Sequence, residues 1–168
     1  MSSKEHKEHA AKQVRLGIIT LSSTRTMSED ESGKWIAEKA ESEGHELLFH
    51  QVITDDAEII RKSVAGNIRD HDPDALLMTG GTGISAKDVT IEAVRPLFDK
   101  ELTAFGSLFA QLSFDEIGSA AILSRATAGL IGKTAVFCMP GSLKACKLAC
   151  NKLIFPELGH LAKHIRRG

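Results

Sequence analysis

The fold of this chain is decided by the stretch from Leu76 to Val89, which reads Leu-Leu-Met-Thr-Gly-Gly-Thr-Gly-Ile-Ser-Ala-Lys-Asp-Val. An apolar run that is typical of a buried strand ends there in a glycine-rich polar turn, and Lys87 and Asp88 follow. Missing side chains let an anion approach the N–H groups of such a turn, and a following helix points its positive end toward the anion. The stretch therefore predicts a phosphate site between a strand and a helix whose N-cap is Thr90.

The same turn has a plainer interpretation. Three glycines within four residues also fit an ordinary strand-to-helix connection that needs positive φ angles. The turn lacks the Gly-Lys-Ser/Thr ending of a P-loop and the spacing of a Gly-x-Gly-x-x-Gly dinucleotide fingerprint. The cation and the carboxylate directly after the turn favour the phosphate site over the plain connection.

Strand-like and helix-like segments alternate on both sides of this stretch, as in a parallel α/β sheet. We expect strands at residues 14–21, 47–53, 74–78 and 134–139, and helices at residues 29–43, 57–68, 91–97 and 143–155. The fold class is thus α/β, with three α/β/α layers around a mostly parallel sheet. In such folds ligands bind at the carboxyl ends of the strands.

Two features of the second half have open interpretations. The turn Pro140-Gly141-Ser142 leads from a strand into a helix with Ser142 as N-cap, and it fits either a second anion site or a common turn. Residues 102–114 form an amphipathic segment whose apolar side chains fit either the core or a subunit face. The side chains with these two interpretations are those of Phe109, Leu112 and Phe114.

A possible metal pattern lies near the end of the chain. Cys146, Cys150, His160 and His164 form a Cys-x3-Cys-x9-His-x3-His series, and pairs four residues apart share a helix face. The cysteine pair lies inside a helical run, however, and Pro156 interrupts the short segment between the pairs. We therefore favour two buried thiols and two exposed histidines over a Zn²⁺ site.

Composition narrows the function classes. The 168 residues fit one domain, which we place at residues 14–168 after a flexible tail at residues 1–13. A net charge of −1, from 21 basic and 22 acidic residues, argues against nucleic-acid binding. No apolar run approaches the roughly 18–20 residues that span a bilayer, so we expect no membrane partner. We expect a cytoplasmic protein whose three cysteines are reduced.

Several motifs together resemble the signature of one family. The stretch from Thr79 to Thr90 carries the main part of it, and further stretches match at residues 22–25, 55–56, 105–106, 122–125 and 139–142. Their joint order is similar to that of the MoaB/Mog family, the molybdopterin adenylyltransferases, which is related to the gephyrin G domain. The resemblance covers residues 14–165 and implies a MoaB/Mog-like, molybdopterin-binding fold.

The resemblance implies that AMP is transferred from ATP to the terminal phosphate of molybdopterin in molybdenum or tungsten cofactor biosynthesis, with release of pyrophosphate. It implies Mg²⁺ as cofactor, with Asp55 and Asp88 as catalytic residues and metal ligands. Residues implied to bind the nucleotide phosphates are Thr79, Gly80, Gly81, Thr82, Gly83 and Lys87. Residues implied to bind the substrate are Ser22, Arg25, Ser124, Arg125, Pro140, Gly141 and Ser142. It also implies a homotrimer or homohexamer and a downstream metal-inserting enzyme as partner.

The acidic residues have structural alternatives. Asp55 and Asp56 also fit caps of the helix at residues 57–68, and Asp88 also fits a turn residue bonded to nearby backbone. The alternative function is a non-catalytic molybdopterin-binding or scaffold protein of the same fold. Such a protein would bind ligand but release no pyrophosphate from ATP.

The basic residues also have two interpretations. Arg25 and Arg125 fit surface charges as well as phosphate ligands, because a guanidinium suits phosphate oxygens. The sequence departs from the family at two positions, since the family often has Asp where Ser23 stands and Arg where Lys87 stands. Lys87 keeps the charge and loses the bidentate geometry, so we expect a looser clamp or one that recruits Arg25 or Arg125.

Overall fold

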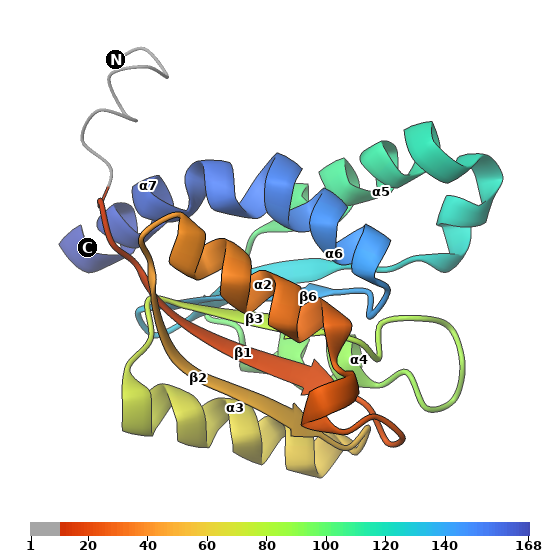
Figure 1. Cartoon of the computed structure of the whole chain (residues 1–168), viewed down its shortest axis with the longest axis horizontal. Coiled ribbons are helices and arrows are strands. Elements are labelled where there is room, and N and C mark those ends of the chain that lie inside the picture. Colours follow the sequence, from red (N-terminus) through yellow and green to blue (C-terminus); the bar gives the residue numbers. More distant parts are fainter. Residues whose placement is uncertain (1–10) are drawn as a thin grey trace.

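The computed structural model describes residues 11–168, whose strands form a single mixed sheet (Figure 1). Within this part of the chain the sheet has six strands in the order β2-β1-β3-β6-β5-β4. β2, β1, β3 and β6 are parallel neighbours, whereas β5 pairs antiparallel with both β6 and β4. The strands are β1 Arg15–Leu21, β2 Glu46–Ile53, β3 Ala75–Thr79, β4 Lys100–Glu101, β5 Thr127–Ile131 and β6 Thr134–Met139.

Helices cover both faces of the sheet, with α2, α5, α6 and α7 over one face and α3 and α4 over the other (Figure 1). The helices are α2 Glu31–Ser42, α3 Ala57–His71, α4 Thr90–Val94, α5 Thr103–Ile117, α6 Leu143–Ala149 and α7 Phe155–Arg167. Short 3-10 turns lie at η1 Met27–Glu29, η2 Arg95–Leu97 and η3 Gly118–Leu123, and a π turn lies at η4 Cys150–Ile154. None of the helices in the described range is both long and apolar enough to cross a membrane.

The apolar core has two parts because successive side chains of a strand point to opposite faces. In β1, Leu16 and Ile18 belong to the part under α2, α5, α6 and α7, whereas Ile19 and Leu21 belong to the part under α3 and α4. A sheet buried on both faces explains why its central strands are almost continuously apolar. The predicted three-layer α/β/α fold with a mostly parallel sheet is confirmed.

The antiparallel strands β4 and β5 are absent from the strands expected from the sequence. β4 contains two residues, and β5 reads Thr-Ala-Gly-Leu-Ile, with a glycine that lowers strand propensity. A Cβ placed on Gly129 would lie 2.4 Å from Cδ2 of Phe98, so the missing side chain makes room for that ring. Gly129 weakens the strand pattern of β5 in the sequence, yet the packing of Phe98 requires a glycine there.

The two strand-to-helix turns differ in their caps. Ser142 caps α6 as predicted, because its hydroxyl accepts a hydrogen bond of 3.2 Å from the N–H of Ala145. The prediction that Thr90 caps the other helix is wrong: Val89 occupies the cap position, and Thr90 is the first helical residue. The Thr90 hydroxyl instead donates to the carbonyl of Gly80 at 2.9 Å. The Thr90 side chain, which the sequence predicts to be a helix cap, therefore stabilises the glycine turn instead.

The start of the described chain lies against α7. The N–H of Ala11 donates to the carbonyl of Gly159 at 3.0 Å, and Val14 is fully buried. Residues 1–10 of the predicted flexible tail lie outside the described residues, so that prediction stays untested.

Candidate functional site

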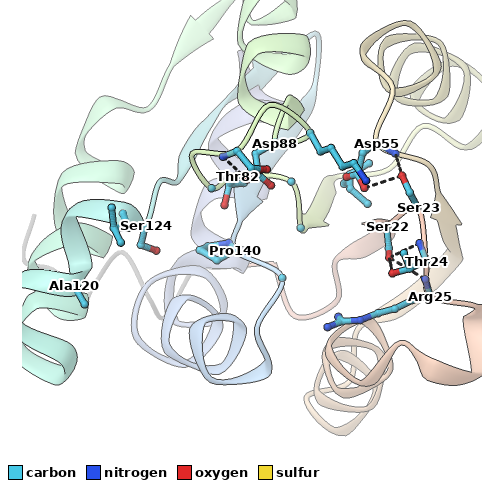
Figure 2. A pocket seen from close by; sticks show the side chains of 18 residues that line it. Ser22, Ser23, Thr24, Arg25, Asp55, Thr82, Asp88, Ala120, Ser124 and Pro140 are labelled. Carbon is cyan, nitrogen blue, oxygen red and sulfur yellow. Dashed lines mark hydrogen bonds between the residues drawn. The ribbon is translucent and has the colours of Figure 1, made fainter.

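A cavity of about 580 Å³ opens where the strands β1, β2, β3 and β6 end (Figure 2). The segments that line it come from four strand ends and from η3, which are far apart in the sequence. Predicted site residues that line the cavity are Ser22, Arg25, Asp55, Gly80, Gly81, Thr82, Gly83, Lys87, Asp88, Ser124, Pro140 and Gly141. A volume between about 300 and 1,000 Å³ is typical of small-molecule sites.

The glycine turn after β3 has a backbone that side chains would not allow. Gly80 and Gly81 have φ angles of +101° and +67°, which L-residues with a Cβ rarely adopt. A Cβ on Gly80 would lie 2.4 Å from the carbonyl oxygen of Leu21, and a Cβ on Gly141 would lie 3.2 Å from the Cα of Gly80. The glycines therefore let the ends of β1, β3 and β6 converge on one point.

The backbone amides of this turn differ in their engagement. The N–H of Gly80 donates to the carbonyl of Met139 at 3.0 Å, which corrects the expectation that Gly80 offers its amide to an anion. Within the described residues, no hydrogen bond engages the N–H of Gly81, Thr82 or Gly83. These three amides are therefore unused hydrogen-bond donors, a feature typical of backbone anion sites.

The hydroxyl of Thr82 is a further unused donor. Thr82 is 2% exposed, and its Oγ1 is the buried side-chain polar atom without a hydrogen-bond partner in the described part of the chain. Thr82 lines the cavity and is drawn beside Asp88 in Figure 2. An unpaired buried hydroxyl costs about 1–3 kcal/mol of free energy, and a ligand atom that accepts a hydrogen bond from it would recover that cost.

Asp55 and Asp56 have separate roles although they are adjacent. Asp56 caps α3, because its Oδ1 accepts from the N–H of Ile59 at 2.9 Å. Asp55 lines the cavity, where its Oδ2 accepts from the Ser23 hydroxyl at 3.1 Å. Its Oδ1 lies 3.1 Å from the position that a Cβ on Gly81 would occupy. The helix-cap alternative therefore holds for Asp56 and leaves the Asp55 carboxylate facing the glycine turn.

Asp88 lies on the other side of the same turn. Its Oδ2 accepts from the N–H and the hydroxyl of Ser85, at 2.9 and 2.7 Å, so the turn-forming role is real. The same oxygen lies 2.7 Å from the position of a Cβ on Gly83, and Asp88 lines the cavity. The hydrogen bonds from Ser85 hold the carboxylate in place against the glycine turn.

Cations and hydroxyls complete the lining. Arg25 and Lys87 both reach the cavity, on the segments after β1 and after the glycine turn. The Ser22 hydroxyl accepts from the N–H of Arg25 at 3.0 Å, and this contact shapes the loop that carries the guanidinium (Figure 2). A ligand in the cavity thus meets positive side chains beside carboxylates, which suits a polyanion together with a metal ion.

Arg125 supports the turn rather than lining the cavity. Its guanidinium donates to the carbonyls of Thr82 and Gly83 at 2.8 to 3.0 Å and forms an ion pair with Glu92 at 2.5 Å. The hydrogen bonds to Glu92 raise the pKa of Arg125, so the guanidinium stays charged. Its donors are used on the loop behind the amides, so the prediction that Arg125 binds substrate stays a prediction.

Two other predicted residues also lie outside the cavity lining. Thr79 is fully buried, and its hydroxyl donates to the carbonyl of Pro140 at 3.0 Å, which joins β3 to the turn after β6. Ser142 is used as the α6 cap and lines a smaller neighbouring cavity of about 120 Å³. Both hydroxyls are used in holding the backbone, and the predicted ligand contacts of Thr79 and Ser142 stay predictions.

A buried carboxylate beneath the site escaped the sequence analysis. Asp30 is 1% exposed and caps α2, accepting from the N–H of Gly33 at 3.0 Å, from the Thr20 hydroxyl at 2.6 Å and from Nε2 of His50 at 2.7 Å. Burial raises the pKa of Asp30, but these hydrogen bonds together outweigh burial and lower the pKa below its ordinary value. An acidic N-cap before a helical run is a signal that could have found Asp30.

The helix that Asp30 caps reaches the site. Ser32, in the first turn of α2, donates its hydroxyl to the carbonyl of Gly141 at 2.9 Å. The cavity lining also includes Ser85, Ala120 and Leu123, to which the sequence analysis assigned no role. Ser85 and Leu123 lie inside stretches that match the family, whereas Ala120 is brought to the cavity only by the fold.

The four residues of the Cys/His series do not come together. Cys146 and Cys150 are fully buried in the core, whereas His160 and His164 lie on the exposed side of α7. Burial raises the pKa of both thiols, which opposes the thiolate form that binds Zn²⁺. Buried thiols and histidines at the surface agree with the interpretation favoured from the sequence.

The fold and the site together define an α/β protein with a glycine turn of unengaged amides at the carboxyl edge of its sheet. Residues 17–160 match the model of the probable molybdopterin binding domain. The molybdenum cofactor biosynthesis protein B of Bacillus subtilis strain 168 is 51% identical over 168 residues, covering 99% of each chain.

Solved structures agree with this match. A crystal structure of molybdenum cofactor biosynthesis protein B has a TM-score of 0.91 at 47% identity, covering 95% of this chain and 100% of its own. The tungsten cofactor synthesizing protein MoaB from Pyrococcus furiosus has a TM-score of 0.83 at 38% identity, covering 94% and 99%. The chain belongs to the molybdenum cofactor biosynthesis protein B family, which confirms the resemblance seen in the sequence.

Proposed function

We propose that this chain acts in molybdenum or tungsten cofactor biosynthesis by transferring AMP from Mg-ATP to molybdopterin. The observation that carries the proposal is the turn at residues 80–83, which offers three unengaged amides and the unpaired Thr82 hydroxyl between the carboxylates of Asp55 and Asp88. Membership of the family supports molybdopterin as the substrate and molybdenum cofactor biosynthesis as the pathway.

The donor set fits Mg²⁺. Asp55 and Asp88 face the glycine turn from two sides, and within residues 11–168 no group of three or more His, Cys, Asp or Glu is arranged to hold a metal ion. Mg²⁺ keeps several waters and is bound through one or two carboxylates plus substrate phosphates, which matches this pair. When bound there, the ion would neutralise charge on the phosphates.

The chain's own groups supply the remaining stabilisation. In the proposed reaction a terminal phosphate oxygen of molybdopterin attacks the α-phosphorus of ATP, the bond to the β-phosphate oxygen breaks, and pyrophosphate leaves. Negative charge builds on the departing pyrophosphate and around the α-phosphorus. The amides of residues 81–83 and the Thr82 hydroxyl are fixed donors for that charge, and Lys87 and Arg25 are mobile cations beside them.

The test is direct synthesis. The full chain is incubated with molybdopterin, ATP and Mg²⁺, and both adenylylated pterin and pyrophosphate are measured. Asp55→Asn and Asp88→Asn should each lower the rate by about 100-fold or more while the melting temperature changes little, since each removes a charge and almost no volume.

Asp56→Asn is the matched control for Asp55→Asn. It makes the same chemical change one residue away, outside the cavity lining and at a cap that asparagine also serves. Equal rates for both variants would contradict the role of Asp55. Binding of molybdopterin without any ATP-dependent pyrophosphate would contradict catalysis and favour the non-catalytic binding or scaffold protein.

We also propose that the chain forms a homotrimer or homohexamer. Large apolar side chains are exposed along α5 and η3, while Phe109 of the same segment is in the core. The exposed members are Leu108, Phe114, Ile117, Ile122 and Leu123. Such a patch marks an interaction surface, and light scattering of the purified chain measures the subunit number.

A further inference from the structure

The Asp30 carboxylate joins three elements behind the candidate site. Its side chain is 0% exposed and accepts hydrogen bonds from β1, β2 and α2. The donors are the Thr20 hydroxyl at 2.6 Å, Nε2 of His50 at 2.7 Å and the N–H of Gly33 at 3.0 Å. The lowered pKa of Asp30 keeps the carboxylate ionised at neutral pH. Because an ionised carboxylate only accepts hydrogen bonds, the donating proton of His50 lies on Nε2.

The contact between His50 and Asp30 depends on a glycine in the first turn of α2. A Cβ on Gly33 would lie 2.2 Å from Oδ2 of Asp30 and 2.3 Å from Nε2 of His50. A side chain at position 33 would therefore displace one of the two partners. His50 belongs to β2, which stands at one end of the strand order. Gly33 thus allows an edge strand to hold the start of α2.

The hydrogen bond between Thr20 and Asp30 closes the base of the loop that leads from β1 to α2. Thr20 is the penultimate residue of β1, and Asp30 is the N-cap of α2. Residues 21–25 lie between them and line the main cavity, with Arg25 as their cation. A loop whose ends are tied together has fewer conformations. The Asp30 carboxylate therefore limits the positions that the Arg25 side chain can reach.

The first turn of α2 also holds the turn after β6. Ser32 is 1% exposed and donates its hydroxyl to the carbonyl of Gly141 at 2.9 Å. Arg25, Ser32 and Gly141 together line a cavity of about 270 Å³, and Arg25 and Gly141 also line the main cavity. The wall between these two cavities is therefore built from segments that Asp30 holds.

We propose that His50 is a positioning residue of the candidate site, which acts through Asp30 on the loop of Arg25 and on the turn at Gly141. The inference rests on the proposed function, because it takes Arg25 and Gly141 as contacts of molybdopterin. His50 touches no ligand itself. Its hydrogen bond fixes the buried carboxylate, and the carboxylate fixes the two segments before a ligand binds.

The amides of the glycine turn have separate supports. The guanidinium of Arg125 holds the carbonyls of Thr82 and Gly83, and the Thr90 hydroxyl holds the carbonyl of Gly80. These contacts involve neither α2 nor β2. Loss of the His50 contact should therefore weaken the binding of molybdopterin more than the binding of ATP.

The test compares His50→Met with His50→Gln in the full chain, by calorimetric titration with molybdopterin and with ATP and Mg²⁺. Methionine removes a donor from the buried carboxylate, whereas the amide of glutamine places an N–H near the position of Nε2. His50→Met should lower the molybdopterin affinity by about tenfold or more, because the positioned arrangement becomes a minor population. The loss for ATP should be smaller, and His50→Gln should recover the molybdopterin affinity. Equal losses for the two ligands, or no recovery with glutamine, would overturn the proposal.

His45→Met is the matched control. His45 directly precedes β2, at the end of the sheet opposite the cavity, and its Nδ1 accepts from the N–H of Val14 at 3.2 Å. This variant should lower Tm and leave both affinities unchanged. Ser32→Ala removes only the last contact in the series and should also lower the molybdopterin affinity, so it serves as the test if His50→Met does not fold. Unchanged affinity in Ser32→Ala would contradict the path through α2.

Hydrogen exchange of the free chain separates this inference from the proposed function. Peptides that cover residues 30–34 and 141–146 should exchange faster in His50→Met than in His45→Met. Equal exchange in the two variants would overturn the positioning role. If the unchanged chain binds molybdopterin but forms no adenylylated pterin, only the proposed function fails, because affinity and exchange are measured without turnover.

Discussion

Substitution of Gly81 by alanine isolates what the glycine turn requires of its backbone. Gly81 has a φ angle of +67°, and a Cβ there would lie 2.3 Å from the hydroxyl oxygen of Thr90 and 3.1 Å from Oδ1 of Asp55. The Thr90 hydroxyl is buried and donates to the carbonyl of Gly80 at 2.9 Å. The alanine methyl group therefore meets a side chain that is fixed by its own hydrogen bond.

The cost follows from two contributions. A left-handed backbone costs an alanine about 1–2 kcal/mol relative to glycine. Displacement of the Thr90 hydroxyl leaves buried polar groups unpaired, which costs about 1–3 kcal/mol more. We expect Gly81→Ala to lower the free energy of unfolding by about 3 kcal/mol, which for a chain of this size lowers Tm by roughly 6–12 °C.

Gly132→Ala is the matched control, measured beside it by thermal and urea unfolding. Gly132 has a φ angle of +57°, and a Cβ there would meet nothing within 4 Å. Gly132→Ala therefore has only the cost of an alanine in a left-handed backbone conformation. Its Tm should fall by roughly 2–4 °C for each 1 kcal/mol of stability lost. The smaller entropy of the unfolded chain affects both variants alike and cancels in the comparison.

A double-mutant cycle with Thr90→Ala identifies the clash. Thr90→Ala alone loses the hydrogen bond to Gly80, and Gly81→Ala/Thr90→Ala should cost less than the sum of the two single variants because the clashing oxygen is gone. Equal losses for Gly81→Ala and Gly132→Ala, together with additive costs in the cycle, would refute the packing argument.

Three further predictions concern the support of the site. Asp30→Asn should lower the free energy of unfolding at neutral pH. Folding lowers the pKa of Asp30, so its stabilising contribution is present above the ordinary value of 3.8 and is lost as the pH falls through the lower folded value. In urea unfolding, the stability of the variant should therefore depend less on pH in the acid range than that of the unchanged chain. Arg125→Met should raise the hydrogen exchange rates of residues 82–85 and weaken ATP binding without removing a cavity-lining charge, and unchanged exchange would contradict its bracing role. Arg166→Met leaves the buried Asp74 carboxylate without its guanidinium partner and should cost about 2 kcal/mol of stability while turnover per folded molecule is kept.

The sequence predicts the centre of this fold because local signals agree there. β3 and β6 are apolar runs that end in glycine turns, and hydrophobicity, turn residues and the cap at Ser142 all point to the same structure. The antiparallel strand β5 has no such agreement. Its glycine argues against a strand until the ring of Phe98, which packs on it, is in place.

The candidate site shows the same division between local and non-local information. The residues that reach the cavity were found because short motifs place them at strand ends. Which of two adjacent acids faces the turn, Asp55 or Asp56, depends on the path of the chain into α3. Arg125 contacts carbonyls more than forty residues away, so no local pattern distinguishes a brace from a phosphate ligand.

The cavity therefore combines a rigid half with an adjustable half. Thr79, Ser32 and the close approach of Gly80 to Gly141 fix the turns after β3 and β6 before any ligand arrives. Amides held in this way lose little entropy on binding, so their interaction with an anion goes into affinity and into charge stabilisation. Arg25 and Lys87 reach the cavity on long side chains, which in the proposed reaction would follow the charge as it moves to the leaving pyrophosphate. If the rigid half carries the specificity, variants that loosen it should lose ATP affinity more than variants that shorten either cation.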